Sequence, residues 1–220
     1  MPAVRCIDLD GCPTRRGGGA VQRIAVADRR ASLLAAALRV IARDGVARAS
    51  TRVIAAEAGM PTASFHYVFA SHAAMLEELV AGILEAQAAA VAEAVGEAGT
   101  LHEFAGGALQ GWLDRAAAEP AVEIALQDVV AFSRASPDLH HLAATVYEHY
   151  AASVAGFVAA AEERFGVRWT VPSADVARFV LVLTDGVAAR WLVDRDEAAA
   201  RRALALGTRA LLALVQEQRP

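Results

Sequence analysis

The sequence predicts an all-α protein. Apolar residues recur at intervals of three and four along most of the 220 residues, as at Leu33, Ala37 and Ile41, which is the spacing of a buried helix stripe. Hairpin signals are missing, because the pair Asp185-Gly186 lies inside such a stripe rather than between alternating strands. With 56% hydrophobic residues, a chain of this length can bury a large core without disulfides.

The first half of the chain divides into a leader and four helices. Residues 1–26 have no periodicity and contain several glycines, so we expect a flexible leader there. A first helix begins near Asp28 and ends at Asp44-Gly45. Ser50 is placed to cap a second helix, Gly59 to make a tight turn into a third, and Ser71 to cap a long fourth helix that starts near His72.

The second half contains about five more helices. The predicted breaks fall at 96–100, 119–120, 136–137, 166–173 and 194–196. Ser136-Pro137 combines a capping hydroxyl with a proline at the first helical position, and Asp196 is placed to cap the last helix. We therefore expect a three-helix, helix-turn-helix head over residues 27–75 and a helical bundle over residues 76–220.

Charge is divided unevenly between these two parts. Residues 1–75 carry 10 arginines and 5 acidic residues, which gives +5, and residues 76–220 carry 11 arginines and 20 acidic residues, which gives −9, for a total of −4. Arginine in place of the absent lysine explains the residue type but not this segregation. A basic head on an acidic body indicates a phosphate-binding module attached to a part that should not bind nucleic acid.

The second and third helices are typical of a unit that lies on DNA. Ile54 and Ala58 share one face of the second helix, and Phe65, Val68 and Phe69 share one face of the third. The third helix then presents small or hydrogen-bonding side chains outward, as a helix in a major groove requires. These are Thr62, Ala63, Ser64, His66 and Tyr67.

This module resembles the tetracycline-repressor (TetR) family of transcriptional regulators. The resemblance rests on Arg30, Leu33-Leu34, Ala36-Ala37 and Gly45, then on Ser50-Thr51, Ile54-Ala55 and Ala58-Gly59, then on Phe65, His66 and Phe69, over roughly Arg30 to Leu79. A second resemblance, to the helix that many members use to dimerise, covers Arg178 to Leu192. The resemblance to this family implies a regulator, usually a repressor, that binds a palindromic operator as a homodimer and is released by a small effector.

The resemblance also implies a DNA-binding surface, with two departures from the family. The expected surface consists of Arg30, Ser50, Thr51, Arg52, Pro61, Thr62, Ala63, Ser64, His66, Tyr67 and His72. His66 stands where the family commonly has a phosphate-binding tyrosine, and His72 where it has a lysine. Because an imidazole is largely neutral above about pH 7, we expect a weaker or more pH-dependent grip on the DNA backbone. Both could instead be ordinary surface residues at the rim.

Base reading by the third helix is limited by its composition. Residues 61–69 include no Arg, Lys, Asn or Gln, the residue types that make bidentate contacts with guanine or adenine. Arg52 is the best candidate for a guanine contact, and a plain phosphate contact is the alternative. Arg29 and Arg48 would add charge on the phosphate side. In the leader, Arg15 and Arg16 would either enter a minor groove or belong to a flexible tail.

The family resemblance further implies a ligand cavity and a dimer interface. The predicted lining of a mostly apolar cavity includes Phe104, Trp112, Phe132 and Tyr147, with Gln127 and Asp128 as polar groups; for the apolar residues the alternative is ordinary core. The predicted dimer interface comprises Phe179, Val182, Leu183, Val187, Trp191, Leu204 and Leu211, for which the alternative is again the core of one protomer.

Several other classes of function find no support. Cys6 and Cys12 lack a second ligand pair and are expected to be free thiols. His140 and His141 point about 100° apart on a helix, so we expect no metal site and no cofactor. No nucleophile stands near a partner base, no membrane span or secretory signal is evident, and we expect a cytoplasmic protein. The alternative to a regulator is a helical interaction module or enzyme whose head has lost DNA binding.

Overall fold

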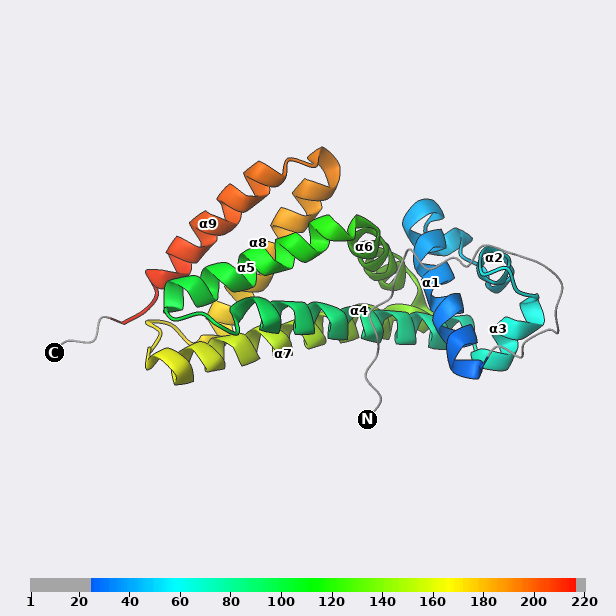
Figure 1. Cartoon of the computed structure of the whole chain (residues 1–220), viewed down its shortest axis with the longest axis horizontal. Helices are drawn as coiled ribbons and strands as arrows, with labels where there is room; N and C mark the ends of the chain where they lie inside the picture. The colour runs from blue at the N-terminus through cyan, green and yellow to red at the C-terminus, as the bar shows by residue number, and fades with distance from the viewer. Residues whose placement is uncertain (1–24, 217–220) are drawn as a thin grey trace.

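The computed structural model describes residues 25–216, and within this range it contains only helices and one isolated backbone bridge (Figure 1). The prediction of an all-α fold is confirmed, as are five helices after the fourth. The expected leader with Arg15 and Arg16 lies almost wholly outside the described residues. The elements are α1 (Val26–Asp44), η1 (Val46–Arg48, a 3₁₀ turn), α2 (Thr51–Glu57), α3 (Thr62–Val68), α4 (His72–Val95), α5 (Leu101–Ala118), α6 (Pro120–Ala135), η2 (Pro137–Leu139, a 3₁₀ turn), α7 (His140–Phe165), α8 (Ser173–Asp194) and α9 (Glu197–Leu212).

Side-chain caps begin three of the helices where the sequence predicts them. Ser50 accepts a hydrogen bond from the Val53 amide, Ser71 accepts one from the Ala74 amide at 3.0 Å, and Asp196 accepts one from the Ala199 amide at 2.8 Å. Each cap satisfies an amide that has no partner within its own helix.

The prediction for Ser136-Pro137 was right about the break and about the proline but wrong about the cap. Ser136 makes no capping bond with its side chain, and Pro137 stands at the first position of the 3₁₀ turn η2. The long helix α7 begins three residues later, at His140.

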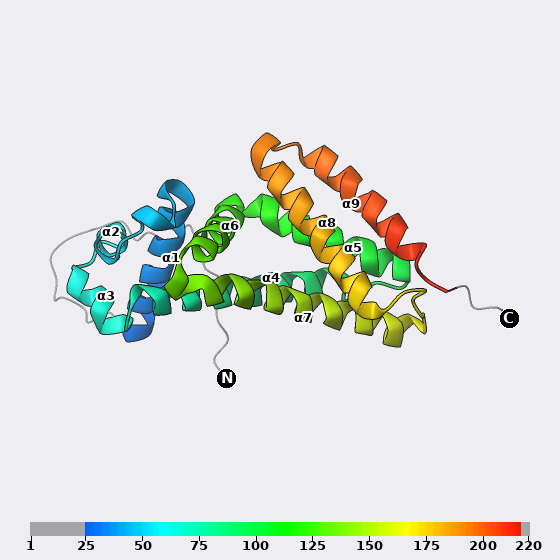
Figure 2. The same cartoon turned by 180° about the vertical axis from the view of Figure 1, so that it is seen from behind.

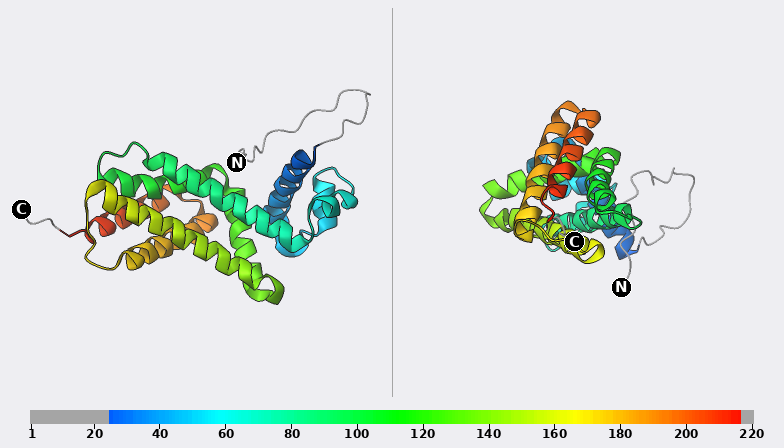
Figure 3. Two further views of the ribbon diagram at one scale, coloured as in Figure 1. Left: turned by 90° about the horizontal axis from the view of Figure 1, so that it is seen from below. Right: turned by 90° about the vertical axis from the view of Figure 1, so that its left-hand side faces the viewer.

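The molecule is elongated, with the helix-turn-helix head at one end (Figure 1). Helices α4 and α7 run in the same direction from the head to the far end, and α6 lies between the head and the remaining helices (Figures 1 and 2). Helices α8 and α9 form an antiparallel pair on one side of the body, as the views from below and from the end also show (Figure 3). No single described helix is both long and apolar enough to cross a membrane; α3 and α4 pass that test only as a pair bent by 68°.

One hydrophobic core joins the head to the body. Leu33, Ile54 and Phe65 of the head belong to the same buried cluster as Leu79 of α4 and Leu142 of α7. The predicted boundary after residue 75 falls in the first turn of α4, which continues into the body. A displacement of α4 or α6 therefore acts directly on the packing of the head.

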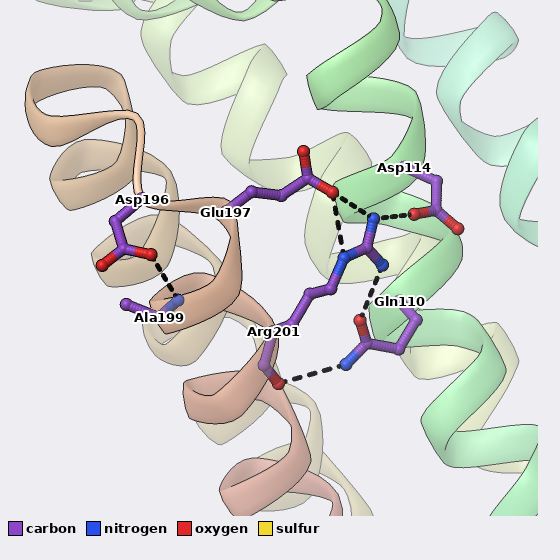
Figure 4. Close-up of polar contacts among 6 residues, drawn as sticks. All are labelled: Gln110, Asp114, Asp196, Glu197, Ala199 and Arg201. Carbon is purple, nitrogen blue, oxygen red and sulfur yellow. Dashed lines mark hydrogen bonds and ion pairs between the residues drawn. The ribbon is translucent and has the colours of Figure 1, made fainter.

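Helix α9 is held to α5 by a polar cluster and to α8 by close packing. The Arg201 guanidinium lies between Asp114 of α5, at 2.6 Å, and Glu197 of α9, at 2.5 Å, and Gln110 of α5 bonds to the same residue (Figure 4). At Gly207 an added Cβ would lie 2.1 Å from the end of the Leu183 side chain, so any other residue at this position would require that side chain to shift.

Candidate DNA interface and ligand cavity

The turn between α2 and α3 is fixed by glycine geometry and buried apolar side chains. Gly59 has φ +67°, a left-handed conformation in which glycine is strongly favoured. The Met60 amide donates to the Ala55 carbonyl at 2.8 Å and closes the turn. Ile54 and Phe65 are fully buried, which orients α3 with one face inward. Its opposite face is thereby held outward on a rigid support.

That outward face carries the residues predicted from the sequence. Ala63, His66 and Tyr67 are exposed, and 68% of the Tyr67 surface is accessible. The other predicted residues here are Pro61, which is exposed just before α3, and Thr62 and Ser64 of α3, which are half-buried. Arg29, from the first turn of α1, holds its guanidinium 5.7 Å from the centre of the Tyr67 ring. The guanidinium of Arg29 and the phenol of Tyr67 therefore lie together on the outward side of α3.

Two arginines near α2 have no internal partner. Arg48 and Arg52 are exposed, and neither side chain has a hydrogen bond or ion pair with any part of the chain between residues 25 and 216. Arg39 and Arg43 differ, since both bind Glu57, at 3.1 Å and 3.2 Å. The hydrogen bond from Arg39 is the main reason that the pKa of Glu57 lies below its ordinary value. Among the described residues of the head, the positive charge available to phosphates is thus that of Arg29, Arg48 and Arg52.

The other predicted DNA contacts are already used inside the head. Arg30 forms an ion pair with Glu78, donates to the Val68 carbonyl at 3.1 Å and lies over the ring of Phe69. His72 donates from Nε2 to the Ala49 carbonyl at 2.8 Å. Ser50 caps α2 and Thr51 is half-buried at its first residue. Arg30 and His72 therefore stabilise the packing of the head. To contact DNA, each side chain would have to share or break these interactions.

The body contains a cavity of about 430 Å³ bounded chiefly by α4 to α8. Of the residues predicted to line it, Phe104, Trp112, Gln127 and Tyr147 do so. Most of the surrounding surface is aliphatic or aromatic. A space of this size and character can hold a small, largely apolar molecule.

Two predicted lining residues lie elsewhere. Asp128 accepts a hydrogen bond from the Val46 amide at 2.6 Å and so joins α6 to η1 in the head. Phe132 packs against the core cluster shared by head and body. Both predictions of cavity lining were wrong, because residues 128 and 132 lie on the side of α6 that meets the head rather than on the side that meets the cavity.

The cavity wall includes a buried carboxyl group that is not fully paired. Glu123 of α6 is 6% exposed, its Oε1 accepts a long hydrogen bond of 3.4 Å from Gln127, and its Oε2 has no partner within the described chain. Burial raises the pKa of Glu123, and nearby Asp185 raises it further. Beside it the Tyr150 hydroxyl donates to Gln87 at 2.7 Å, and burial also raises the pKa of Tyr150.

The cavity opens between α6, α7 and α8. Its exposed lining residues include Arg134, Tyr147 and Asp185, one from each of these helices. Burial raises the pKa of Asp185 at this opening, where the Tyr147 hydroxyl acts in the opposite direction. Sequence reasoning missed Glu123, Tyr150 and Asp185. The only available signal was a carboxyl group among the aliphatic residues of α6. The spacing of residues along a helix does not show which neighbouring helix such a side chain faces.

The residues predicted for a dimer interface fall into two groups. Val187, Trp191, Leu204 and Leu211 are buried inside the protomer, in a cluster with Leu113 of α5. For these four, the alternative of protomer core is what the structure shows. Leu183 is partly buried and packs against the same cluster. The predicted Phe179 and Val182 of α8 are exposed, as are two further apolar residues, Val193 of α8 and Leu206 of α9.

Comparison with known proteins identifies the head. Residues 33–79 match the family described as "Bacterial regulatory proteins, tetR family", and this range contains the turn, α3 and the start of α4 described above. This match identifies the head of the chain as a TetR-family head. The members of that family are transcriptional regulators with a helix-turn-helix DNA-binding head and are not enzymes.

Individual relatives extend the similarity beyond the head. The chain is 27% identical over 175 residues to the HTH-type nicotine-responsive transcriptional repressor HdnoR of Paenarthrobacter nicotinovorans, a match that covers 80% of this chain and 89% of that protein.

Solved structures show the same fold. A transcriptional regulator from Rhodococcus sp. Rha1 superposes with a TM-score of 0.72 at 18% identity, covering 87% of this chain and 99% of that one. A putative TetR-family regulator from Syntrophomonas wolfei gives 0.74 at 14% identity, covering 89% and 100%.

Proposed function

We propose that this TetR-family regulator represses transcription by binding a palindromic operator as a homodimer, and that a small, mostly apolar effector releases it. In this proposal residues 27–75 bind DNA and residues 76–220 bind the effector and the second protomer. The observation that carries the proposal is the outward face of α3 flanked by the unpaired arginines Arg48 and Arg52. The similarity to a nicotine-responsive repressor supports repression and a small-molecule response.

Specific contact with bases is assigned to Arg52 and to small groups on α3. Arg52 is free and exposed at the start of α2, and a guanidinium can bind guanine O6 and N7 together. Thr62 and Ala63 suit contact with thymine methyl groups, and Tyr67 with Arg29 suits contact with a phosphate. One such head covers only a few base pairs, so two heads on a two-fold symmetric site are expected.

Selection of bound sequences from a random pool of DNA duplexes tests this function. Enrichment of one palindrome supports the regulator, and no enrichment at low salt contradicts it and favours a head that has lost DNA binding. The selected duplex then allows a test of Arg52.

Arg52→Ala is expected to relax the preference at one base pair of each half-site, by about 1–3 kcal/mol of discrimination. Quantitative binding to the palindrome and to its single-base variants measures this. Arg168→Ala provides the control, because Arg168 is exposed far from the head. A uniform loss of affinity for every sequence would make Arg52 a phosphate contact only.

The dimer is proposed to form through the exposed apolar side chains of α8 and α9. Phe179, Val182 and Val193 follow one face of α8, and Leu206 is exposed on α9, which packs against α8. Apolar side chains on two packed helices, each exposed by more than a third, form the kind of patch that a second copy would cover. Two such pairs would meet as a four-helix interface.

The effector is proposed to act through α6. This helix lines the cavity with Gln127 and binds the head with Asp128, the next residue. Occupation of the cavity would shift α6 and with it η1, which leads directly into α2. The change in spacing of the two heads would then remove them from successive half-sites.

A further inference from the structure

The cavity wall is electrostatically unbalanced toward negative charge. Two carboxyl groups line it, Glu123 inside and Asp185 at the opening, together with one guanidinium, that of Arg134 at the opening, and the imidazole of His149. Glu123 forms no ion pair with any described residue, and its Oε2 has no hydrogen-bond donor there. A buried carboxyl group without a partner is costly and is normally paired, so this one lacks the group that would satisfy it.

The neighbours of Glu123 point to the chemistry of that missing group. Tyr150 cannot supply a proton to Glu123 while its hydroxyl is donated to Gln87. The aromatic rings of Trp112, Tyr147 and Tyr150 line the same cavity. Carboxylates together with aromatic faces are the surroundings that bind an organic ammonium group, the former through charge and hydrogen bonds and the latter through cation–π attraction.

Two other unpartnered polar atoms belong to residues that line the cavity: Nε1 of Trp169 and Nε2 of His149, which lies on α7. Trp169 packs with the apolar cluster around Phe104. None of the three atoms has a hydrogen-bond partner among the described residues, so neither ring satisfies Glu123 Oε2.

We propose that the cavity binds a small organic cation, a protonated amine on an apolar body, with its ammonium group at Glu123. This rests on the proposed effector cavity and specifies what it takes. The ammonium donates to Glu123 Oε2, the apolar body fills the aliphatic and aromatic remainder, and Asp185 adds attraction at the opening. An organic anion would meet the Glu123 carboxyl group, and the described lining residues place no guanidinium inside the cavity to compensate it.

Three probes of one shape test the proposal: 4-phenylbutylamine, 4-phenylbutan-1-ol and 4-phenylbutanoate. Binding to the full chain is followed by calorimetry and by the fluorescence of Trp112 and Trp169, which line the cavity. The amine is expected to bind about tenfold or more tightly than the alcohol, and the carboxylate more weakly than both. Equal or tighter binding of the alcohol or the carboxylate overturns the proposal.

Glu123→Gln then locates the charge, because it keeps the shape and the bond with Gln127. Affinity for the amine should fall about tenfold or more, and affinity for the alcohol should change less than about twofold. Glu148→Gln, an exposed carboxylate on α7 outside the cavity, is the matched control and should change neither. Unchanged amine selectivity in Glu123→Gln contradicts the assignment.

Asp185→Asn supplies a second variant in case Glu123→Gln does not fold, which circular dichroism shows. Asp185→Asn is expected to lose less amine affinity than is expected for Glu123→Gln, because Asp185 is exposed. A loss as large as the one expected for Glu123→Gln would instead place the cation site at the opening of the cavity. Binding of the selected palindrome is measured separately for the free protein. Intact DNA binding without amine selectivity refutes this inference alone, whereas amine selectivity without DNA binding refutes the proposed regulator alone.

Discussion

The bond between Asp128 and the Val46 amide is the polar link from α6 to the head, and Asp128→Ala removes it. Val46 is 3% exposed and its amide lies 2.6 Å from Asp128 Oδ2. A hydrogen bond to a charged group contributes about 1.5–3 kcal/mol, and a buried amide left without a partner costs about 1–3 kcal/mol. We therefore expect the free energy of unfolding to fall by about 2 kcal/mol, and by less in Asp128→Asn, which keeps an acceptor oxygen.

Amide hydrogen exchange gives the sharper assay, because it reports the link itself. If local opening at Val46 becomes easier by about 2 kcal/mol, its amide exchanges roughly 30-fold faster, while urea unfolding gives the global change. Asp138→Ala serves as control, since Asp138 is exposed on η2. Unchanged protection of the Val46 amide in Asp128→Ala would refute the reasoning, whatever happened to global stability.

Three further expectations concern the cavity, the dimer and the head. Burial raises the pKa of Glu123 above its ordinary 4.5, so its contribution to stability is present below that pH and is lost as pH rises through the raised value. The melting temperature of Glu123→Gln relative to the parent should therefore rise as the pH increases above about 4.5, and a constant difference contradicts this. Val182→Glu should dissociate the dimer in sedimentation experiments, whereas Ala144→Glu, exposed on α7, should not; a dimeric Val182→Glu protein moves the interface elsewhere. His66→Ala should weaken operator binding by roughly two- to fivefold, since the exposed imidazole on α3 would lose its contact with the DNA backbone. An unchanged affinity of His66→Ala would exclude this role for His66.

Local chemistry accounts for what could be predicted about the fold. Ser50, Ser71 and Asp196 act as caps through bonds to amides three residues along the chain, so a single sequence contains all the information needed. Gly59 and the buried Phe65 define the turn in the same way. Ser136 failed as a cap because the bend at Pro137 tightened into a 3₁₀ turn before α7 began.

The side of a helix that meets a given neighbour could not be predicted from periodicity. Helix α8 is apolar on two sides: Val187 and Trp191 enter the protomer core, whereas Val182 faces outward. Both sets have helical spacing, so the sequence predicted one interface where there are two surfaces. The same ambiguity assigned Asp128 to the cavity, although only the docking of α6 against η1 decides its direction.

Helix α6 connects the proposed effector cavity to the proposed DNA-binding head. Glu123 and Asp128 are five residues apart on a single helix, about 7.5 Å along its axis, so the proposed cation site lies less than two turns from the bond that holds the head. A helix of this length moves as a rigid body more easily than it bends. A cation that draws Glu123 into the cavity must therefore either stretch the bond between Asp128 and Val46 or pull η1 with it. Amine binding to the free protein should then alter exchange at the Val46 amide, and in Asp128→Ala it should bind without doing so.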